Sequence, residues 1–234
     1  MYRSLEMAFN NQSQLTETEL KLYGMSGRQF RHFYNNLGAL IPEIHYLEIG
    51  IYAGSTMVSL LAGNAANVKT VVGIDYWDDG DVLGDPHGGM TKVKVMFDEV
   101  LPRYTTSTQD IHIMHADCRR VSPDSLLELI GTKRFNLYLF DGPHDVKDHF
   151  LAIVNYFPVL SDTFILVVDD WNWQMVRAGT ETALTALSDQ LVVLGKIELL
   201  TGDHPIVDGV PWHNGMAVFV IQKLYLQTVN VDAV

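Results

Sequence analysis

The stretch at residues 46–63, YLEIGIYAGSTMVSLLAG, decides the fold expected of this chain. Residues 46–49 read as a buried strand, residues 50–54 as a turn with a glycine at each end, and the residues from Ser55 onward as a helix. A strand, a tight turn and a helix in this order direct the helix N-terminus and several free N–H groups at one point. The stretch therefore predicts a ligand-binding βα unit.

Glu48 restricts the ligand of this unit, because it precedes the first glycine of the turn by two positions. A carboxylate there would repel the pyrophosphate of a dinucleotide, and the turn lacks the G-x-G-x-x-G spacing of dinucleotide-binding proteins. The two glycines, Gly50 and Gly54, carry no Cβ and let a ligand approach the backbone. Glu48 therefore favours a cationic, phosphate-free ligand.

Composition indicates a soluble enzyme-sized domain. The chain has 234 residues, 47% hydrophobic and 19% charged, with a net charge of −12, which argues against nucleic-acid or anionic-membrane partners. The single cysteine, Cys118, forbids an internal disulfide and fits a reducing compartment. The N-terminus has no apolar signal region, and no run of about 18 apolar residues predicts a membrane span. We expect a cytoplasmic protein.

Residues 1–45 are expected to form an N-terminal helical extension ahead of the main domain at 46–234. Residues 1–14 are polar and are expected to be partly mobile. Thr16 and Glu19 form a capping-box pattern that predicts a helix ending near Gly24. A second helix carries Phe30 to Leu37 and is expected to end at Gly38. These helices pack on the sheet or cover a cofactor, and a homodimer through them is one hypothesis.

Alternating strands and helices follow. The predicted strands after residues 46–49 are residues 70–75, 111–118, 135–140, 163–168, 196–200 and 216–225. Helices are predicted at 91–103, from 122 onward, at 146–157 and at 176–190. The last two strands have no helix between them, which favours an antiparallel edge. The fold class is therefore α/β, a doubly wound, mostly parallel seven-stranded sheet.

Acidic side chains follow five successive strands of this sheet. They are Glu48, Asp75, Asp117, Asp141 and the pair Asp169/Asp170. Because the carboxyl ends of parallel strands meet at one edge, these groups are expected to surround one ligand site. The loop at residues 78–90, DDGDVLGDPHGGM, is predicted to be a lid or substrate-contacting segment, with its acids in solvent rather than binding calcium.

The strand-E-x-G-x-x-x-G pattern followed by Asp75 and Asp117 resembles the class I S-adenosylmethionine-dependent methyltransferases from residue 46 onward. The resemblance implies that Glu48 binds the methionine ammonium group, Asp75 the ribose hydroxyls, and Asp117 the adenine amino group. Tyr52 departs from the motif, in which a glycine is common there. Trp77 either offers a flat surface to the adenine or packs at the rim. The implied cofactor set is Glu48, Gly50, Tyr52, Gly54, Ser55, Asp75, Tyr76, Trp77, Asp117, Cys118 and Asp141.

The acids after the fourth and fifth strands are similar to those of metal-dependent O-methyltransferases acting on catechols, sugars and natural products. This resemblance implies Asp141, Asp169 and Asp170 as ligands of Mg²⁺, with the metal lowering the pKa of the acceptor hydroxyl. Asp141 and His144 are the predicted catalytic residues, His144 as general base. The alternative is that Asp141 and His144 cap the next helix and Asp170 pairs with Arg177.

Four ring side chains border the same edge, and they are Trp171, Trp173, Trp212 and His213. They are predicted to form a pocket for an aromatic or sugar acceptor, with rim packing as the alternative. The sequence thus predicts methyl transfer from S-adenosylmethionine to a small-molecule hydroxyl. A Mg²⁺-assisted and a metal-independent reaction both stay open, as do a nucleotide- or NAD-dependent oxidoreductase and a non-catalytic cofactor-binding protein.

Overall fold

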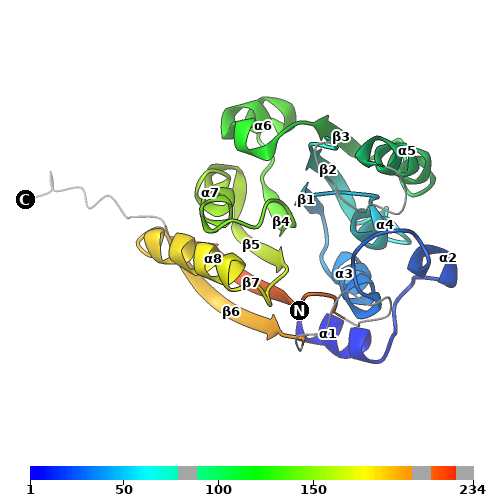
Figure 1. Cartoon of the computed structure of the whole chain (residues 1–234), viewed down its shortest axis with the longest axis horizontal. Coiled ribbons are helices and arrows are strands. Elements are labelled where there is room, and N and C mark those ends of the chain that lie inside the picture. Colours follow the sequence, from blue (N-terminus) through cyan, green and yellow to red (C-terminus); the bar gives the residue numbers. More distant parts are fainter. Residues whose placement is uncertain (79–88, 202–211, 225–234) are drawn as a thin grey trace, which may run out of the picture.

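The protein is built around one seven-stranded sheet with the strand order β3-β2-β1-β4-β5-β7-β6 (Figure 1). The computed structural model describes residues 1–78, 89–201 and 212–224. The strands are β1 (Ile44–Ile49), β2 (Val68–Asp75), β3 (Asp110–His115), β4 (Phe135–Phe140), β5 (Leu160–Asp169), β6 (Leu191–Leu199) and β7 (Met216–Lys223).

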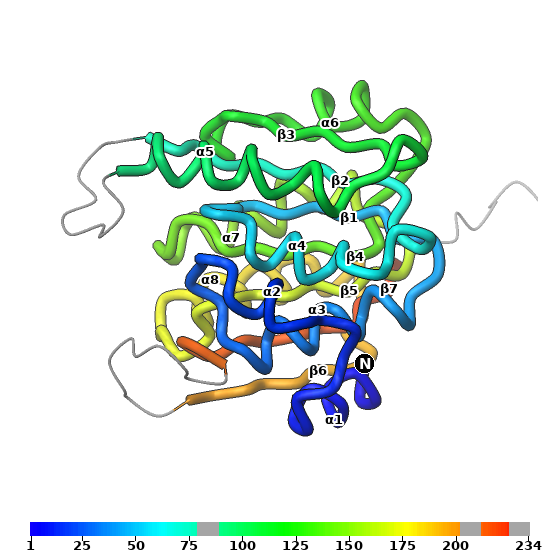
Figure 2. The backbone as a smooth tube through the Cα atoms, turned by 90° about the vertical axis from the view of Figure 1, so that its right-hand side faces the viewer, coloured from blue at the N-terminus to red at the C-terminus, as the bar shows by residue number. Residues whose placement is uncertain are grey.

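The strand directions confirm the predicted fold class. β1 to β5 pair in parallel, while β7 lies antiparallel between β5 and β6. Figure 2 shows the strands stacked in this order, from β3 at the top to β6 at the bottom. The last strand was expected to reach Tyr225, which lies outside the described residues. β6 begins five residues earlier than the expected 196, because an edge strand needs hydrogen bonds from β7 rather than a continuous apolar run.

Helices cover both faces of the sheet. They are α1 (Tyr2–Phe9), α2 (Glu17–Leu20), α3 (Arg28–Leu40), α4 (Ser55–Leu61), α5 (Met90–Val100), α6 (Pro123–Ile130), α7 (Val146–Val154) and α8 (Gln174–Ala186). Side chains of α6, α7 and α8 form one apolar core with the sheet, and those of α3, α4 and α5 form the other (Figure 1). None of the helices in the described part of the chain has the length and apolar run needed to cross a bilayer.

The first residues form a docked helix, so the expectation of a partly mobile polar segment at 1–14 was wrong. Ser4 and Ala8 of α1 are fully buried, and Ala8 belongs to the core beneath α3. The Asn36 amide donates to the carbonyls of Ser4 and Gln12. α1 has only about two turns, so its apolar face is too short for the sequence to predict a docked helix among the polar residues around it.

The next two helices also differ from the sequence prediction in their ends. The capping box is present, since the Thr18 N–H donates to Thr16 Oγ1 and the Thr16 N–H to Glu19 Oε2, but α2 stops at Leu20. α3 continues through Gly38 to Leu40. A Cβ on Gly38 would lie 2.4 Å from the Asn64 side chain, so this glycine permits close packing on α4 rather than ending the helix.

Candidate active site

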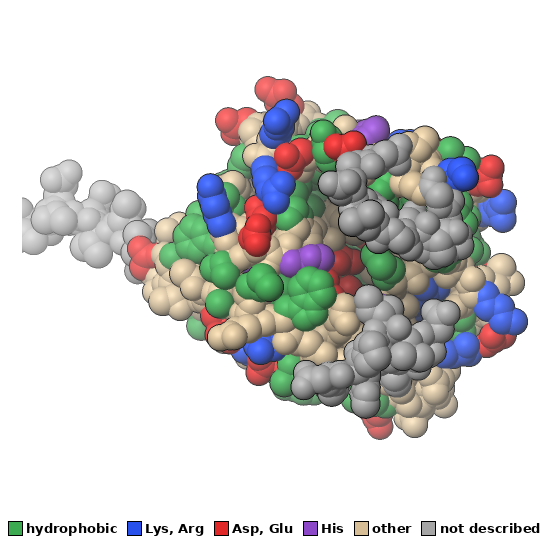
Figure 3. All heavy atoms as spheres, in the orientation of Figure 1, with side chains coloured by type: hydrophobic (Ala, Val, Ile, Leu, Met, Phe, Trp, Pro, Cys, Tyr) green, Lys and Arg blue, Asp and Glu red, His purple; other side chains and the backbone are tan. Residues whose placement is uncertain are grey.

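A cavity of about 430 Å³ lies over the carboxyl ends of the parallel strands. Figure 3 shows acidic and histidine side chains gathered at the middle of this face of the molecule. The lining residues that the sequence predicted are Gly50, Tyr52, Asp75, Tyr76, Asp117, Cys118, Asp141, His144, Asp169, Asp170, Trp173 and His213. The five parallel strands thus bring most of the predicted residues to one place.

The glycine turn is shaped by contacts within the protein as much as by any ligand. Gly50 has a φ of +86°, and a Cβ there would lie 1.7 Å from the carbonyl oxygen of Asp141. Gly54 has a φ of +80°, and its Cβ would lie 2.4 Å from the Phe97 ring. Gly50 lines the cavity, whereas Gly54 makes room for Phe97, so only the first glycine exposes backbone to a ligand.

Asp75 joins the end of β2 to this turn. Its Oδ2 accepts hydrogen bonds from the N–H groups of Ile51 and Tyr52, both at 2.7 Å. Its Oδ1 accepts one from the Trp77 N–H at 3.0 Å. The carboxylate also lines the cavity, so one side chain both fixes the turn and offers acceptor lone pairs to a ligand.

The two aromatic residues after Asp75 have different surroundings. Trp77 is only 3% exposed, stacks on Phe97 at 5.6 Å between ring centroids, and donates its indole N–H to the Tyr52 carbonyl. It therefore occupies the packed position that was the alternative for it, away from the cavity. Tyr76 is the aromatic side chain that lines the cavity here.

Glu48 and Ser55 lie beneath the turn rather than on the cavity wall. Glu48 is fully buried, and one of its oxygens accepts a hydrogen bond from the Tyr46 hydroxyl at 3.0 Å. Burial raises the pKa of Glu48 well above its usual value. The placement follows from the strand itself, because Glu48 and Tyr46 share the face covered by α3 while Leu47 and Ile49 point to the opposite face. Ser55 is likewise buried, and its hydroxyl lies 3.0 Å from that of Ser26.

The turn after β3 forms another wall of the cavity. Asp117 accepts a hydrogen bond from the Arg119 N–H and so caps the short 3-10 helix Cys118–Arg120. The Arg119 guanidinium binds both oxygens of Asp148 at 2.8 Å. Burial raises the pKa of the Cys118 thiol to about 11, so Cys118 is a neutral cavity neighbour and not a nucleophile.

Three carboxyl groups meet where β4 and β5 end. Burial raises the pKa of Asp141 well above its usual value, and the charges of Asp169 and Asp170 raise it further. Burial and Asp170 likewise raise the pKa of Asp169, whose Oδ1 has no hydrogen-bond partner among the described residues. Burial also opposes ionisation of Asp170, but the hydrogen bond and charge of His144 hold its pKa below the usual value.

This cluster makes the stability of the ligand-free protein depend on pH. The raised pKa values of Asp141 and Asp169 mean that the folded state binds a proton more tightly than the unfolded chain, in which the value is about 3.8. The contribution of this tightly bound proton to the free energy of unfolding is complete at acid pH. It decreases as the pH rises through the raised pKa of the folded state.

Asp169→Asn is therefore expected to raise the Tm at pH 8 in EDTA by about 2–4 °C, which corresponds to about 1 kcal/mol. The reason is that the amide removes a carboxylate that repels its neighbours without removing the side-chain volume. At pH 5 the difference from the wild type is expected to be smaller. Differential scanning fluorimetry at both pH values measures it, and a lower Tm for the variant at pH 8 would contradict the assignment.

His144 lies against Asp170 and Trp173. Its Nε2 is 2.7 Å from Asp170 Oδ2, and its ring packs edge-on against Trp173 with centroids 4.5 Å apart. The Asn214 amide donates to Asp170 Oδ1 at 2.6 Å, so both oxygens of this carboxylate are engaged. Asp170 has a left-handed φ of +54°, which its two side-chain partners help to maintain.

The alternative roles given to these residues are not seen. Arg177 donates to the carbonyl of Trp171, while Asp170 pairs with His144 instead. α7 begins at Val146 with Asp145 as its N-cap residue, so neither Asp141 nor His144 occupies the cap position.

The same residues form a possible ligand set for a cation. One donor atom each from Asp141, His144 and Asp170 lie within 4.8 Å of one another. His144 thus takes the place that the sequence gave to Asp169 in the metal set. Two carboxylates and an imidazole, with the orphaned Asp169 oxygen beside them, have the donor chemistry that divalent cations require.

Two of the four predicted acceptor-site rings lie elsewhere. Trp171 is fully buried and donates its indole N–H to Glu198, and Trp212 packs against the rings of Phe9 and Phe33. Only Trp173 and His213 line the cavity. Trp171 and Trp212 therefore follow the packing alternative, because the sequence places a ring on a loop without saying to which side it points.

Several cavity residues carried no signal in the sequence. Met25, Arg119 and Asn214 all line the cavity, yet none belongs to a motif, whereas Met90, which also lines it, is the last residue of the loop predicted to contact the substrate. The expected lid at residues 78–90 falls largely outside the described residues, as do its Asp79, Asp81, Asp85 and His87.

The sheet order, together with the family model and the solved structures that match the chain, identifies it as a class I S-adenosylmethionine-dependent methyltransferase. The chain belongs to the methyltransferase domain family, whose model matches residues 47–171, more than half of its length. This membership sets aside the oxidoreductase alternative. No curated protein sequence matches the chain.

Solved structures share the fold at low sequence identity. The O-methyltransferase TomG from Streptomyces achromogenes, in complex with S-adenosylmethionine, is 15% identical with a TM-score of 0.58, over 94% of this chain and 89% of that one. An O-methyltransferase from Bacillus cereus, in complex with S-adenosylhomocysteine, is 13% identical with a TM-score of 0.56, over 94% and 91%. TrmN from Thermus thermophilus is 16% identical with a TM-score of 0.54, covering 88% of this chain, which spans 52% of TrmN.

Proposed function

We propose that the protein transfers a methyl group from S-adenosylmethionine to a hydroxyl group of a small molecule. The observation that carries this proposal is His144, an imidazole on the wall of the same cavity as Asp75 and oriented by Asp170. The bound cofactors of TomG and the Bacillus cereus enzyme support the choice of methyl donor.

The cavity residues fit this cofactor, which would supply an electrophilic methyl group on a sulfonium. Asp75 and Asp117 both line the cavity, where Asp75 would accept the ribose hydroxyls and Asp117 the adenine amino group. Ile49, Ile74 and Ala116 provide apolar walls for a flat ring. The carboxyl group of Asp169, with its unpartnered oxygen, suits a cationic ligand. Glu48 is not part of this set, because it is buried under the turn.

On the acceptor side of the cavity, His144 would be the general base and Asp170 would orient it. His144 Nε2 lies 2.7 Å from Asp170 Oδ2, and this ion-pair contact would favour a proton on Nε2 and leave the lone pair of Nδ1 free. Nδ1 would then take the proton of the acceptor hydroxyl as that oxygen forms a bond to the methyl carbon, while the bond from this carbon to the sulfonium sulfur breaks and S-adenosylhomocysteine leaves. Trp173 and His213 offer flat walls that would hold an aromatic or sugar acceptor in line with the methyl group.

A metal-assisted form of the same reaction is the second candidate, favoured by the ligand set of Asp141, His144 and Asp170. A divalent ion held there would bind acceptor oxygens and favour their deprotonation. In that case His144 would be a metal ligand, and the proton of the acceptor hydroxyl would pass to a different base. The two forms differ in whether His144 binds the metal or the hydroxyl proton.

Calorimetric titration of the protein with S-adenosylhomocysteine tests the cofactor assignment and separates the two forms. We expect binding in EDTA with a Kd in the micromolar range, because Asp75 and Asp117 do not depend on a metal. If 5 mM Mg²⁺ or Mn²⁺ changes the binding enthalpy, and if methyl transfer to a panel of phenols and sugars requires the ion, the metal-assisted form holds. The absence of any binding would contradict the proposed function.

A further inference from the structure

The loop between α2 and α3, residues 21–27 (the α2–α3 loop), reaches the cavity from the N-terminal extension. Met25 lines the cavity. The hydroxyls of Tyr23 and Tyr52 lie 2.6 Å apart, so the loop hydrogen-bonds to the glycine turn. A Cβ on Gly24 would lie 2.0 Å from Ser55 Oγ, which shows how closely the loop approaches the start of α4. The loop is therefore packed directly on the part of the site that would hold the cofactor.

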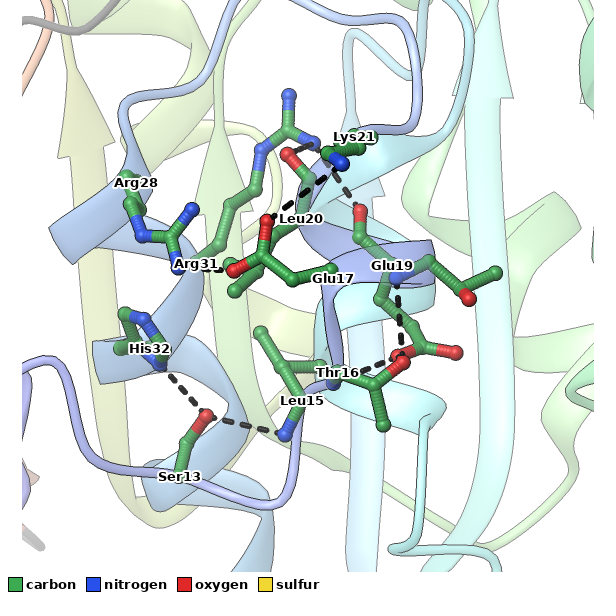
Figure 4. A network of polar contacts seen from close by, with 11 residues as sticks. Ser13, Leu15, Thr16, Glu17, Glu19, Leu20, Lys21, Arg28, Arg31 and His32 are labelled. Carbon is green, nitrogen blue, oxygen red and sulfur yellow. Dashed lines mark hydrogen bonds and ion pairs between the residues drawn. The ribbon is translucent and has the colours of Figure 1, made fainter.

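A single buried guanidinium holds this loop in shape. Arg31 of α3 is 4% exposed, and all three of its nitrogens donate hydrogen bonds. Figure 4 shows its guanidinium against the carbonyls of Glu19 and Leu20 at the end of α2. The acceptors are the carbonyls of Glu19, Leu20, Leu22, Gly24 and Ser26 and the Ser26 hydroxyl. Burial lowers the pKa of Arg31 to about 10, so the side chain is still charged at neutral pH. In the described part of the chain it makes no ion pair, so its charge is balanced by carbonyl dipoles alone.

Three of these carbonyl groups, those of Leu22, Gly24 and Ser26, belong to the irregular loop and would otherwise need other donors. No helix or strand supplies them, because α2 ends at Leu20 and α3 begins at Arg28. α2 has a separate contact to the rest of the protein, in which the Tyr104 hydroxyl donates a hydrogen bond to the Glu19 carboxylate at 2.9 Å. The shape of the loop thus depends on Arg31 more than on its own local sequence.

We propose that the α2–α3 loop is a fixed wall of the cofactor side of the cavity, and that Arg31 is the positioning residue that holds Met25 against the bound cofactor. This rests on the proposed function, since it assumes that the cavity binds S-adenosylmethionine. It assigns to the N-terminal extension a direct part in cofactor affinity, and it makes a residue that does not line the cavity a determinant of that affinity.

A double-mutant cycle on the full chain tests the proposal, with S-adenosylhomocysteine as the calorimetric probe at 15 °C. Met25→Ala is expected to raise the Kd about fivefold with little change in Tm, because this side chain is 53% exposed. Arg31→Leu is expected to raise the Kd at least tenfold. The double variant is expected to bind no more weakly than Arg31→Leu alone, because the methionine is already displaced.

Arg28→Leu is the matched control. Arg28 lies one turn earlier on α3, is exposed and pairs with Glu17 rather than with the loop carbonyls. Its substitution is expected to leave the Kd within twofold of the wild-type value. If Arg31→Leu does not fold, Gly24→Ala replaces it in the cycle, because the added Cβ would push the loop away from Ser55.

The outcomes separate this inference from the proposed function. Suppose that the wild-type protein binds the probe, but the two substitutions have additive effects on the Kd or Met25→Ala leaves the Kd unchanged. Either result overturns the role of the loop and leaves the proposed function standing. A lower Tm of Arg31→Leu without a change in Kd also overturns it, because Arg31 would then only stabilise the fold. Wild-type protein that does not bind the probe contradicts the methyltransferase assignment of the cavity itself.

Discussion

Asp75→Ala is expected to weaken the binding of S-adenosylhomocysteine at least about 100-fold, or about 2.7 kcal/mol. The substitution removes the carboxylate that would accept the ribose hydroxyls. It also leaves the N–H groups of Ile51 and Tyr52 without their acceptor, each at a cost of about 1–3 kcal/mol where water cannot replace it. The lost carboxylate and the disturbed turn both weaken binding of the same ligand, because these N–H groups belong to the turn that lines the cavity.

Two further variants show which effect dominates. Asp75→Asn retains an oxygen for the turn and loses the charge, so it is expected to lie between the wild type and Asp75→Ala in affinity. Asp98→Ala removes a carboxylate that is exposed and pairs with Lys94, and is expected to change the Kd less than twofold. Calorimetry measures all three, and an Asp75→Ala protein with wild-type affinity would remove Asp75 from the cofactor site.

His144→Gln is expected to lower the rate of methyl transfer by about 10²- to 10⁴-fold, the usual contribution of a general base. Glutamine can still hydrogen-bond to Asp170, so the turn after β5 should keep its shape. The affinity for S-adenosylhomocysteine is expected to stay within twofold, because the residues assigned to the cofactor lie on other strands. The measurement is transfer of a labelled methyl group to an acceptor identified from a panel of phenols and sugars.

His45→Gln is the control for this variant, since His45 lies in β1 and hydrogen-bonds to Thr70, remote from the cavity. It is expected to leave the rate unchanged. Equal rates for His144→Gln and the wild type would exclude His144 both as a base and as a metal ligand. A loss of rate that extra Mg²⁺ or Mn²⁺ restores would instead favour the metal-assisted reaction.

The strand ends were predictable from the sequence because they depend on a short-range rule. Apolar runs such as residues 135–140 have no other stable place than the middle of a parallel sheet, and the residue after each run then lies at its edge. Asp75, Asp117 and Asp141 reached the cavity for this reason alone. The missing helix before β7 likewise predicted an antiparallel edge, which the strand pairing confirms.

Side-chain direction and long-range contact were not predictable in the same way. Glu48 belongs to a motif, but its position in the strand turns it under α3 instead of into the cavity. Trp171 and Trp173 are two residues apart, yet one is in the core and the other at the cavity. Met25 comes from a loop whose shape is decided by a guanidinium six positions later, and no local pattern contains that information.

The contact between Gly50 and Asp141 has a mechanical consequence. The two turns touch through backbone atoms, with the Asp141 N–H donating to the Ile49 carbonyl at 2.8 Å and the space of a Cβ on Gly50 filled by the Asp141 carbonyl. No flexible side chain lies between them to absorb a displacement. Under the proposed function, the methyl donor and the acceptor hydroxyl would both be positioned by this one rigid piece of main chain, as in-line attack at about 3–3.5 Å requires.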